Sequence, residues 1–400
     1  MVTPTAPHPA APPAPVVPRP AATRPTARAA GRWGLRRLTL GRPALGRLDL
    51  GQLGPNWYAA VMGTAIVANG AVALPYPVPG RQAFAEVLWV LALAALVVLV
   101  GARLVHLTRH RAAARAQLLD DPATAVFYGC PPMALLAVGY GTLVIGSRLI
   151  GTGPALAVDL VLWTVGTLYA VLVAAGIPYL MITRHDLSAL RANPTWLLPV
   201  VAPMVAAALG PALVTHLPAG LRPALFYGCY GLFGASLLAV LAVLPVVLAG
   251  LLHSGPLGVL LMPSLFLVLG PLGQSTTAVN QLADASRSAA PALAGPALGF
   301  AVLFGVAAIG FALLWLLVAG AANLRALRSG RLPFALTWWA FTFPVGTCVT
   351  GAAALARHTG FAGFGVLAVA LYALLLTAWS VAAVRTLAAL AGGRLLRAAG

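Results

Sequence analysis

The chain has 400 residues, of which 60% are hydrophobic and 8% are charged, and its mean hydropathy is +0.93. A soluble protein needs about 25% charged residues to cover its surface, so the composition excludes a soluble protein and indicates an integral membrane protein. The formal net charge of +18 comes from 25 arginines against 7 acidic residues, and either a nucleic-acid partner or the membrane orientation would explain it.

Residues 1–50 differ from the rest of the chain. They are rich in proline, alanine and arginine and hold one aromatic residue, Trp33. Such a sequence buries little apolar surface, so we expect a disordered cytoplasmic tail. We place one membrane domain over residues 51–390 and a short basic cytoplasmic C-terminus over 391–400.

Ten nearly uncharged stretches follow the tail, each long enough to cross about 30 Å of hydrocarbon. They are continuously apolar and do not alternate every second residue, which favours helices over barrel strands. We expect an all-α membrane protein with spans at 56–75, 85–105, 123–147, 156–182, 194–216, 223–250, 256–280, 292–322, 333–356 and 361–384.

The arginines predict the orientation of the spans. With a cytoplasmic N-terminus, 20 of the 25 arginines lie in inside segments, as the positive-inside rule requires. We therefore expect a multi-pass protein of the inner (plasma) membrane with both termini inside, and no nucleic-acid partner. Five arginines fall one in each outside loop, where they either form a cationic vestibule or lie at the lipid interface: Arg81, Arg148, Arg222, Arg287 and Arg357.

The odd-numbered spans begin roughly 70 residues apart, which indicates five parallel helical hairpins. Four of them carry internal prolines and the first has Gly63 instead, whereas the even spans hold their prolines near an end or have none. An internal proline frees a backbone carbonyl, which must face protein or a water-filled cavity. We expect an inner ring of five kinked odd helices around a pore, with kinks at Gly63, Pro131, Pro203, Pro263, Pro271 and Pro344.

Acidic and basic residues are missing from the middle of the odd spans. Intramembrane carboxylates usually mark proton relays or cation sites, so their absence argues against both. The pore would be lined by apolar and small polar groups, although each hydroxyl could equally bond within its own helix. The candidate lining residues are Thr64, Asn69, Thr142, Ser264, Thr342, Thr347 and Thr350.

Four segments carry a resemblance to a known family. They are Pro55–Thr64 (PNWYAAVMGT), Pro194–Pro203 (PTWLLPVVAP), Gly270–Ser275 (GPLGQS) and Trp338–Thr347 (WWAFTFPVGT). Together they resemble the tellurite-resistance/dicarboxylate transporter family of the voltage-dependent anion channel superfamily, over residues 54–385. Its members include fungal malate permeases, fungal sulfite efflux pumps and plant slow-type anion channels.

This resemblance implies ten helices with pseudo-five-fold symmetry around a pore, in a homotrimer, with Phe343 as the gate in the ninth helix. It also implies transport of small anions, C4-dicarboxylates such as malate first, with sulfite or another inorganic anion as the alternative. Phe341 lies two residues away and points to a nearly opposite face, so one of the two can face the pore.

Two other classes of protein stay open. A membrane-embedded transferase would need a catalytic constellation at a membrane face, and none is visible in the sequence. A scaffold with a closed pore would not need kinked helices. We therefore expect a non-enzymatic protein without cofactor or metal.

Overall fold

The computed structural model describes residues 50–188, 190–253, 257–392 and 395. The predicted tail over 1–50, apart from Leu50, and most of the predicted C-terminal segment 391–400 lie outside the described residues. All regular elements of the described residues are helices, which confirms the all-α class.

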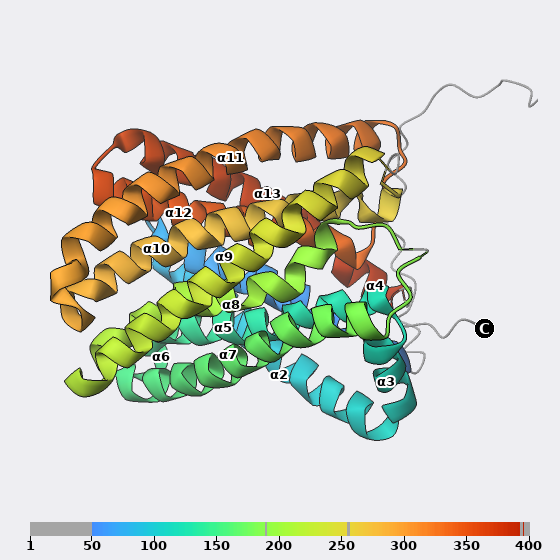
Figure 1. Cartoon of the computed structure of the whole chain (residues 1–400), viewed down its shortest axis with the longest axis horizontal. Coiled ribbons are helices and arrows are strands. Elements are labelled where there is room, and N and C mark those ends of the chain that lie inside the picture. The colour runs from blue at the N-terminus through green and yellow to red at the C-terminus, as the bar shows by residue number, and fades with distance from the viewer. Residues whose placement is uncertain (1–49, 189, 254–256, 393–394, 396–400) are drawn as a thin grey trace, which may run out of the picture. The chain divides into compact units, whose positions relative to one another are not determined.

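Five helical hairpins make up the described chain (Figure 1). The first helices of the hairpins are α1 (Tyr58–Ala73), α5 (Cys130–Gly141), α8 (Leu197–Leu209), α10 (Leu269–Ala289) and α12 (Phe343–Thr359). The second helices are longer: α2 (Arg81–Arg109), α7 (Thr152–Thr183), α9 (Arg222–His253), α11 (Ala294–Arg328) and α13 (Ala362–Ala391). The short helices α3 (Arg111–Leu119), α4 (Pro122–Ala125) and α6 (Ser147–Ile150) lie in the connections.

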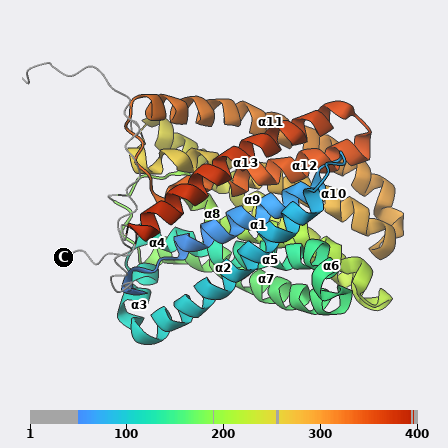
Figure 2. The same cartoon turned by 180° about the vertical axis from the view of Figure 1, so that it is seen from behind.

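The first helices of the hairpins close into a ring. In order, α1 packs against α5, α5 against α8, α8 against α10, α10 against α12, and α12 back against α1. Figure 2 shows α1 beside α13, so the beginning and the end of the described chain meet. Each second helix contacts its own inner helix and the next one around the ring, as α7 does with α5 and α8.

Burial separates the two sets of helices. In the spans that contain α5, α8, α10 and α12, 61% to 94% of the most apolar stretch is buried, against 17% to 28% in the spans of the second helices. The exposed apolar faces of the second helices suit contact with lipid, whereas the inner helices contact protein on most sides. The structure thus has the inner and outer rings that the prolines predict.

Tryptophans join the two rings by hydrogen bonds. The indole Nε1 of Trp89 in α2 donates to the Thr142 hydroxyl at 3.0 Å, and that of Trp379 in α13 donates to the Thr64 hydroxyl at 3.1 Å. Trp163 in α7 and Trp315 in α11 donate to backbone carbonyls of the inner spans. In hydrocarbon such bonds replace the ones that water would provide.

In each inner span a 3₁₀ segment precedes the main α-helix, and in the second inner span the short helix α4 comes before that segment. The 3₁₀ segments are Pro55–Trp57, Val126–Gly129, Pro194–Trp196, Val259–Val268 and Leu336–Phe341. Pro131 and Pro344 lie in the first turns of α5 and α12, where a missing N–H costs no helical bond. These prolines therefore sit where the helix type changes, and Pro203 alone of the predicted kink prolines lies deep inside an α-helix, α8.

The predicted spans differ from the structure in the length of the first helix and in the ends of several others, such as α10 and α13. Of the described helical segments, nine are long and apolar enough to cross a membrane, whereas α1, with 16 residues, is shorter although it completes the ring. The seventh span was expected to end at residue 280, but α10 continues to Ala289. Its last turns are polar and resemble a loop in sequence, yet Gln281 and Asp284 form side-chain hydrogen bonds that hold them on the helix.

Candidate functional site

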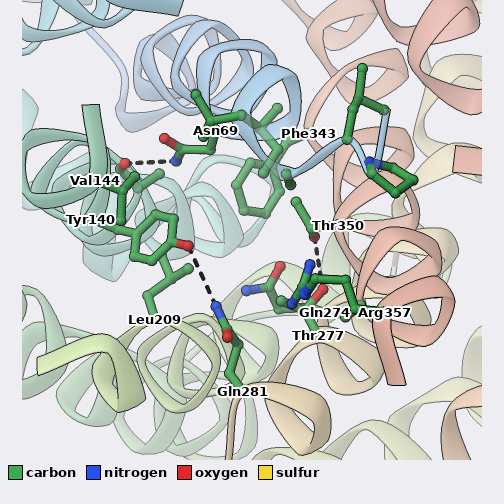
Figure 3. Close-up of a pocket in the computed structure, with 17 residues that line it drawn as sticks. Asn69, Tyr140, Val144, Leu209, Gln274, Thr277, Gln281, Phe343, Thr350 and Arg357 are labelled. Carbon is green, nitrogen blue, oxygen red and sulfur yellow. Dashed lines mark hydrogen bonds between the residues drawn. The ribbon is translucent and has the colours of Figure 1, made fainter. Parts of the chain in front are cut away.

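A cavity of about 530 Å³ lies inside the five-helix ring. All five inner spans line it, mostly through side chains beyond the first turns of their helices, and Phe343 at the start of α12 lines it as well. Figure 3 shows several of these side chains pointing toward the centre of the ring. Because equivalent parts of five parallel hairpins contribute, the cavity lies on the axis of the ring; we call it the wide cavity.

The described lining of the wide cavity combines apolar walls with several polar side chains and holds no acidic residue. Six of its described lining residues carry amides or hydroxyls: Asn69, Tyr140, Gln274, Thr277, Gln281 and Thr350. Among the described residues that line it, Arg357 near the end of α12 is the only charged one. Neutral donors with one guanidinium suit an anion, whereas a cation would need oxygen ligands of negative charge.

A second, much smaller pocket of about 30 Å³ lies on the other side of Phe343. It is lined by the N-terminal ends of all five inner spans, including Asn56, Cys130, Thr195, Ser264 and Trp339. Phe343 lines both this narrow pocket and the wide cavity, and its side chain is 4% exposed. The ring of Phe343 therefore stands between two spaces that share the axis of the helix ring.

The neighbouring phenylalanine has a different environment. Phe341 packs edge-on against Phe266, with ring centroids 4.9 Å apart, and against Trp338 at 5.8 Å. It is not among the described residues that line the wide cavity or the narrow pocket. Of the two candidate phenylalanines, the structure thus places Phe343 on the axis and Phe341 in the packing between helical spans.

The backbone around Phe343 is anchored by its neighbours. The Thr342 hydroxyl donates to the Trp339 carbonyl at 2.7 Å, and the Trp339 indole donates to the Thr386 hydroxyl of α13 at 3.0 Å. On α1, Gly63 allows close approach: an added Cβ would lie 2.8 Å from the Trp339 ring and in contact with the Thr342 hydroxyl. Gly63 lies within the uninterrupted helix α1 and serves as a contact point for this segment.

The predicted polar lining is found only in part. Asn69 and Thr350 line the wide cavity, and Ser264 lines the narrow pocket. Thr64 and Thr142 face the outer ring, where they accept the tryptophan hydrogen bonds described above. Thr342 and Thr347 bond to carbonyls within their own span, and Thr347 also reaches Gly270 of α10. These four hydroxyls are helix-packing groups, the alternative that the sequence left open.

Of the five arginines predicted for a cationic vestibule or the lipid interface, one lines the wide cavity. Arg81 donates to the carbonyls of Leu74 and Tyr76, and Arg222 donates to the Leu217 carbonyl. Arg148 is exposed on the short helix α6, and Arg287 lies in the last turn of α10. Arg357 alone of the five lines the cavity.

Three lining residues on α10 were missed in the sequence. Gln274, Thr277 and Gln281 recur at helical spacing and so share one face of α10. This spacing is a usable signal in the sequence, although Gln281 lies beyond residue 280, the predicted end of the seventh span. Tyr140 gave no comparable signal, because a single tyrosine in an apolar span is typical of a packing residue.

A cluster behind Arg357 ties α12 to α10. The His358 imidazole lies within hydrogen-bond distance of Asn280 Oδ1 and Asp284 Oδ1. Since consecutive helical residues point about 100° apart, fixing His358 toward α10 directs Arg357 to a different face, toward the cavity mouth.

A closed ring of membrane helices around an axial cavity is typical of transmembrane transport proteins and channels. The comparison with protein families specifies the class: a model described as voltage-dependent anion channel matches residues 52–387. The chain therefore belongs to the voltage-dependent anion channel family, and its expected family resemblance is confirmed.

Individual relatives agree with this membership. The chain is 26% identical to an uncharacterized transporter of Methanocaldococcus jannaschii, over 83% of this chain and 92% of the relative. It is 28% identical to a sulfite efflux pump of Arthroderma otae, over 78% and 84% of the two chains, and 27% identical to the sulfite efflux pump of Trichophyton rubrum over the same shares.

Proposed function

We propose that this anion-transport protein conducts small inorganic anions, with sulfite as the first candidate, along the axis of the five-helix ring. The observation that carries the proposal is the wide cavity, whose described lining combines neutral donors with a single guanidinium, that of Arg357. The sulfite efflux pumps among the relatives support the same class of substrate.

Malate and other C4-dicarboxylates, which the sequence placed first, become the second candidate. A dicarboxylate has two carboxylates several ångströms apart, and each is bound best by its own cationic or multiple-donor group. The wide cavity has room for such an ion, but Arg357 is the only cation among its described lining residues. A smaller anion matches this charge pattern better.

Phe343 is the proposed gate. Its ring lies between the wide cavity and the narrow pocket, so transport requires that the ring moves or that the pocket around it widens. Apolar constrictions close pores by steric block and by excluding water. A third pocket, separate from the narrow pocket, also adjoins Phe343, and its apolar lining, including Met62, Met133 and Leu198, supports this role.

The orientation and assembly are also proposals. The arginine distribution supports cytoplasmic termini in the plasma (inner) membrane, with the wide cavity opening outward, and a cytoplasmic tail over residues 1–50. We propose a homotrimer on the basis of the family resemblance. Cysteine labelling from either side of the membrane tests the orientation, and the mass of the purified protein in detergent tests the oligomer.

Flux into liposomes tests the substrate. Purified protein is reconstituted, and uptake of labelled sulfite and labelled malate is compared under imposed voltage and pH gradients, with protein-free liposomes as the control. We expect voltage-driven sulfite uptake that exceeds malate uptake. Malate uptake above sulfite uptake would restore the dicarboxylate assignment, and no uptake of either would contradict the proposed substrates.

A further inference from the structure

Two side chains meet across the wide cavity from helices that are not neighbours in the ring. Gln281 Nε2 of α10 donates to the Tyr140 hydroxyl oxygen of α5 at 3.4 Å. The helix α8 lies between α5 and α10 in the ring and packs against both. The hydrogen bond therefore spans the inner face of α8, and Figure 3 shows Tyr140 and Gln281 reaching toward each other beside Leu209.

We propose that this Tyr140–Gln281 bridge is the element that selects among anions, separate from the Phe343 gate. The proposal rests on the proposed function, because it assigns a specificity role within the same anion path. Both residues line the wide cavity, so an ion in the cavity can contact them.

The position of the bridge puts it on the route to the gate. Met133 of α5 shares a small pocket with Phe343, and Tyr140 follows seven residues later, about 10 Å further along the helix at 1.5 Å per residue. Arg357 lies 14 residues beyond Phe343 on α12, about 21 Å by the same rise. An anion that enters past Arg357 meets the bridge before it meets Phe343.

The chemistry of the bridge suits an anion. Gln281 is the donor and the Tyr140 oxygen the acceptor, so the Tyr140 O–H hydrogen and the second amide hydrogen of Gln281 are left for an ion. The bond is longer than the usual N–H···O range, so an anion can replace it at small cost. Beside the bridge, Leu209 offers the anion no polar group.

Such a pair discriminates by hydration. A strongly hydrated anion such as chloride gives up more hydration free energy on entering the cavity than a weakly hydrated anion such as nitrate. The two neutral donors replace part of that lost hydration, so they favour the strongly hydrated ion relative to an apolar wall. Removing one donor should therefore raise the permeability of nitrate relative to chloride.

Reversal potentials under bi-ionic conditions test the bridge. The Phe343→Ala protein is studied in planar bilayers with chloride on one side and nitrate on the other, and Tyr140→Phe or Gln281→Leu is added. We expect Tyr140→Phe and Gln281→Leu each to raise the nitrate-to-chloride permeability ratio about fivefold. This change is smaller than the full contribution of one hydrogen bond to a charged group. The matched control is Tyr227→Phe on α9, whose side chain is exposed on the outer ring.

The outcomes separate the two proposals. If Tyr140→Phe and Gln281→Leu leave the ratio at the value of the Tyr227→Phe control, while anions still pass, the bridge proposal is wrong and the proposed function stands. If Phe343→Ala gives no current, the same ratio is taken from nitrate and chloride flux into wild-type and Tyr140→Phe liposomes. If anions pass through none of these proteins, the proposed function fails and the bridge proposal fails with it.

Discussion

The His358 ring is held by two side chains of α10: Nδ1 lies 2.7 Å from Asn280 Oδ1, and Nε2 lies 2.9 Å from Asp284 Oδ1. The Asn280 amide nitrogen donates in turn to the Thr276 carbonyl at 2.8 Å, which orients its oxygen toward the imidazole. The His358 side chain is 7% exposed, so water replaces these bonds poorly. The cluster therefore fastens the end of α12 to α10 next to Arg357.

His358→Leu should destabilise the protein. The substitution leaves the buried Asn280 Oδ1 without its partner, and an unpaired buried polar group costs about 1–3 kcal/mol. The Asp284 carboxylate, which is 40% exposed, adds less because water can reach it. The measurement is the melting temperature of the purified protein in detergent. The matched control is Asp120→Asn, because the Asp120–Arg184 pair is 58% and 47% exposed and such surface pairs are worth about 0–1 kcal/mol. Equal shifts for the two variants would show that the His358 cluster adds no more than a surface ion pair.

Arg357→Gln should reduce anion flux and weaken its dependence on salt. Arg357 is the only charged residue among the described lining of the wide cavity, and a cation at a cavity mouth raises the local anion concentration. Because salt screens this field, we expect the loss relative to wild type to be greatest at low ionic strength. Arg148→Gln is the control, since Arg148 is exposed on α6 and is not among the described residues lining the cavity. An Arg357→Gln protein with wild-type flux at low salt would remove Arg357 from the anion path.

Gly63→Ala should disturb the segment that carries Phe343. The new methyl group would meet the Trp339 ring at 2.8 Å and the Thr342 hydroxyl, and overpacking of this kind costs about 1–3 kcal/mol. We expect a lower melting temperature and altered resting flux, because the strain falls directly before the proposed gate. Gly176→Ala on α7 is the control: nothing lies within 4 Å of an added Cβ there. Replacing an interior helical glycine with alanine should be neutral or mildly stabilising. The interpretation fails if the two alanine variants melt at the same temperature.

Much of the fold could be predicted because lipid imposes simple rules on sequence. Continuous apolar runs predicted the membrane helices, and the prolines in alternate spans predicted the inner ring. The sequence predicts kinks at Pro131 and Pro344, whereas the structure places both prolines in the first turns of inner helices. A proline in the first turn and a proline at a mid-helix kink look alike in sequence.

The site was harder to predict because small polar residues have two uses in a membrane. Asn69 and Thr350 line the wide cavity, whereas Thr64 and Thr142 bond to tryptophans of the outer ring. Which use applies depends on the rotation of each helix about its axis, and this rotation is set by contacts between distant segments. Gln281 was missed for a related reason: its polarity resembles that of a loop until its partner across the cavity, Tyr140, is known.

If Phe343 closes an anion path through the five-helix ring, as we propose, then one comparison of currents tests this role most directly. Wild-type, Phe343→Ala and Phe341→Ala proteins are reconstituted in planar bilayers, and anion conductance is measured at a fixed voltage. Both variants remove a phenylalanine side chain, and the two positions are two residues apart. Phe343 lines the wide cavity, whereas Phe341 packs against Phe266 and Trp338. We predict a large increase in conductance for Phe343→Ala and none for Phe341→Ala; wild-type conductance in Phe343→Ala, or an equal increase in both, would contradict the claim.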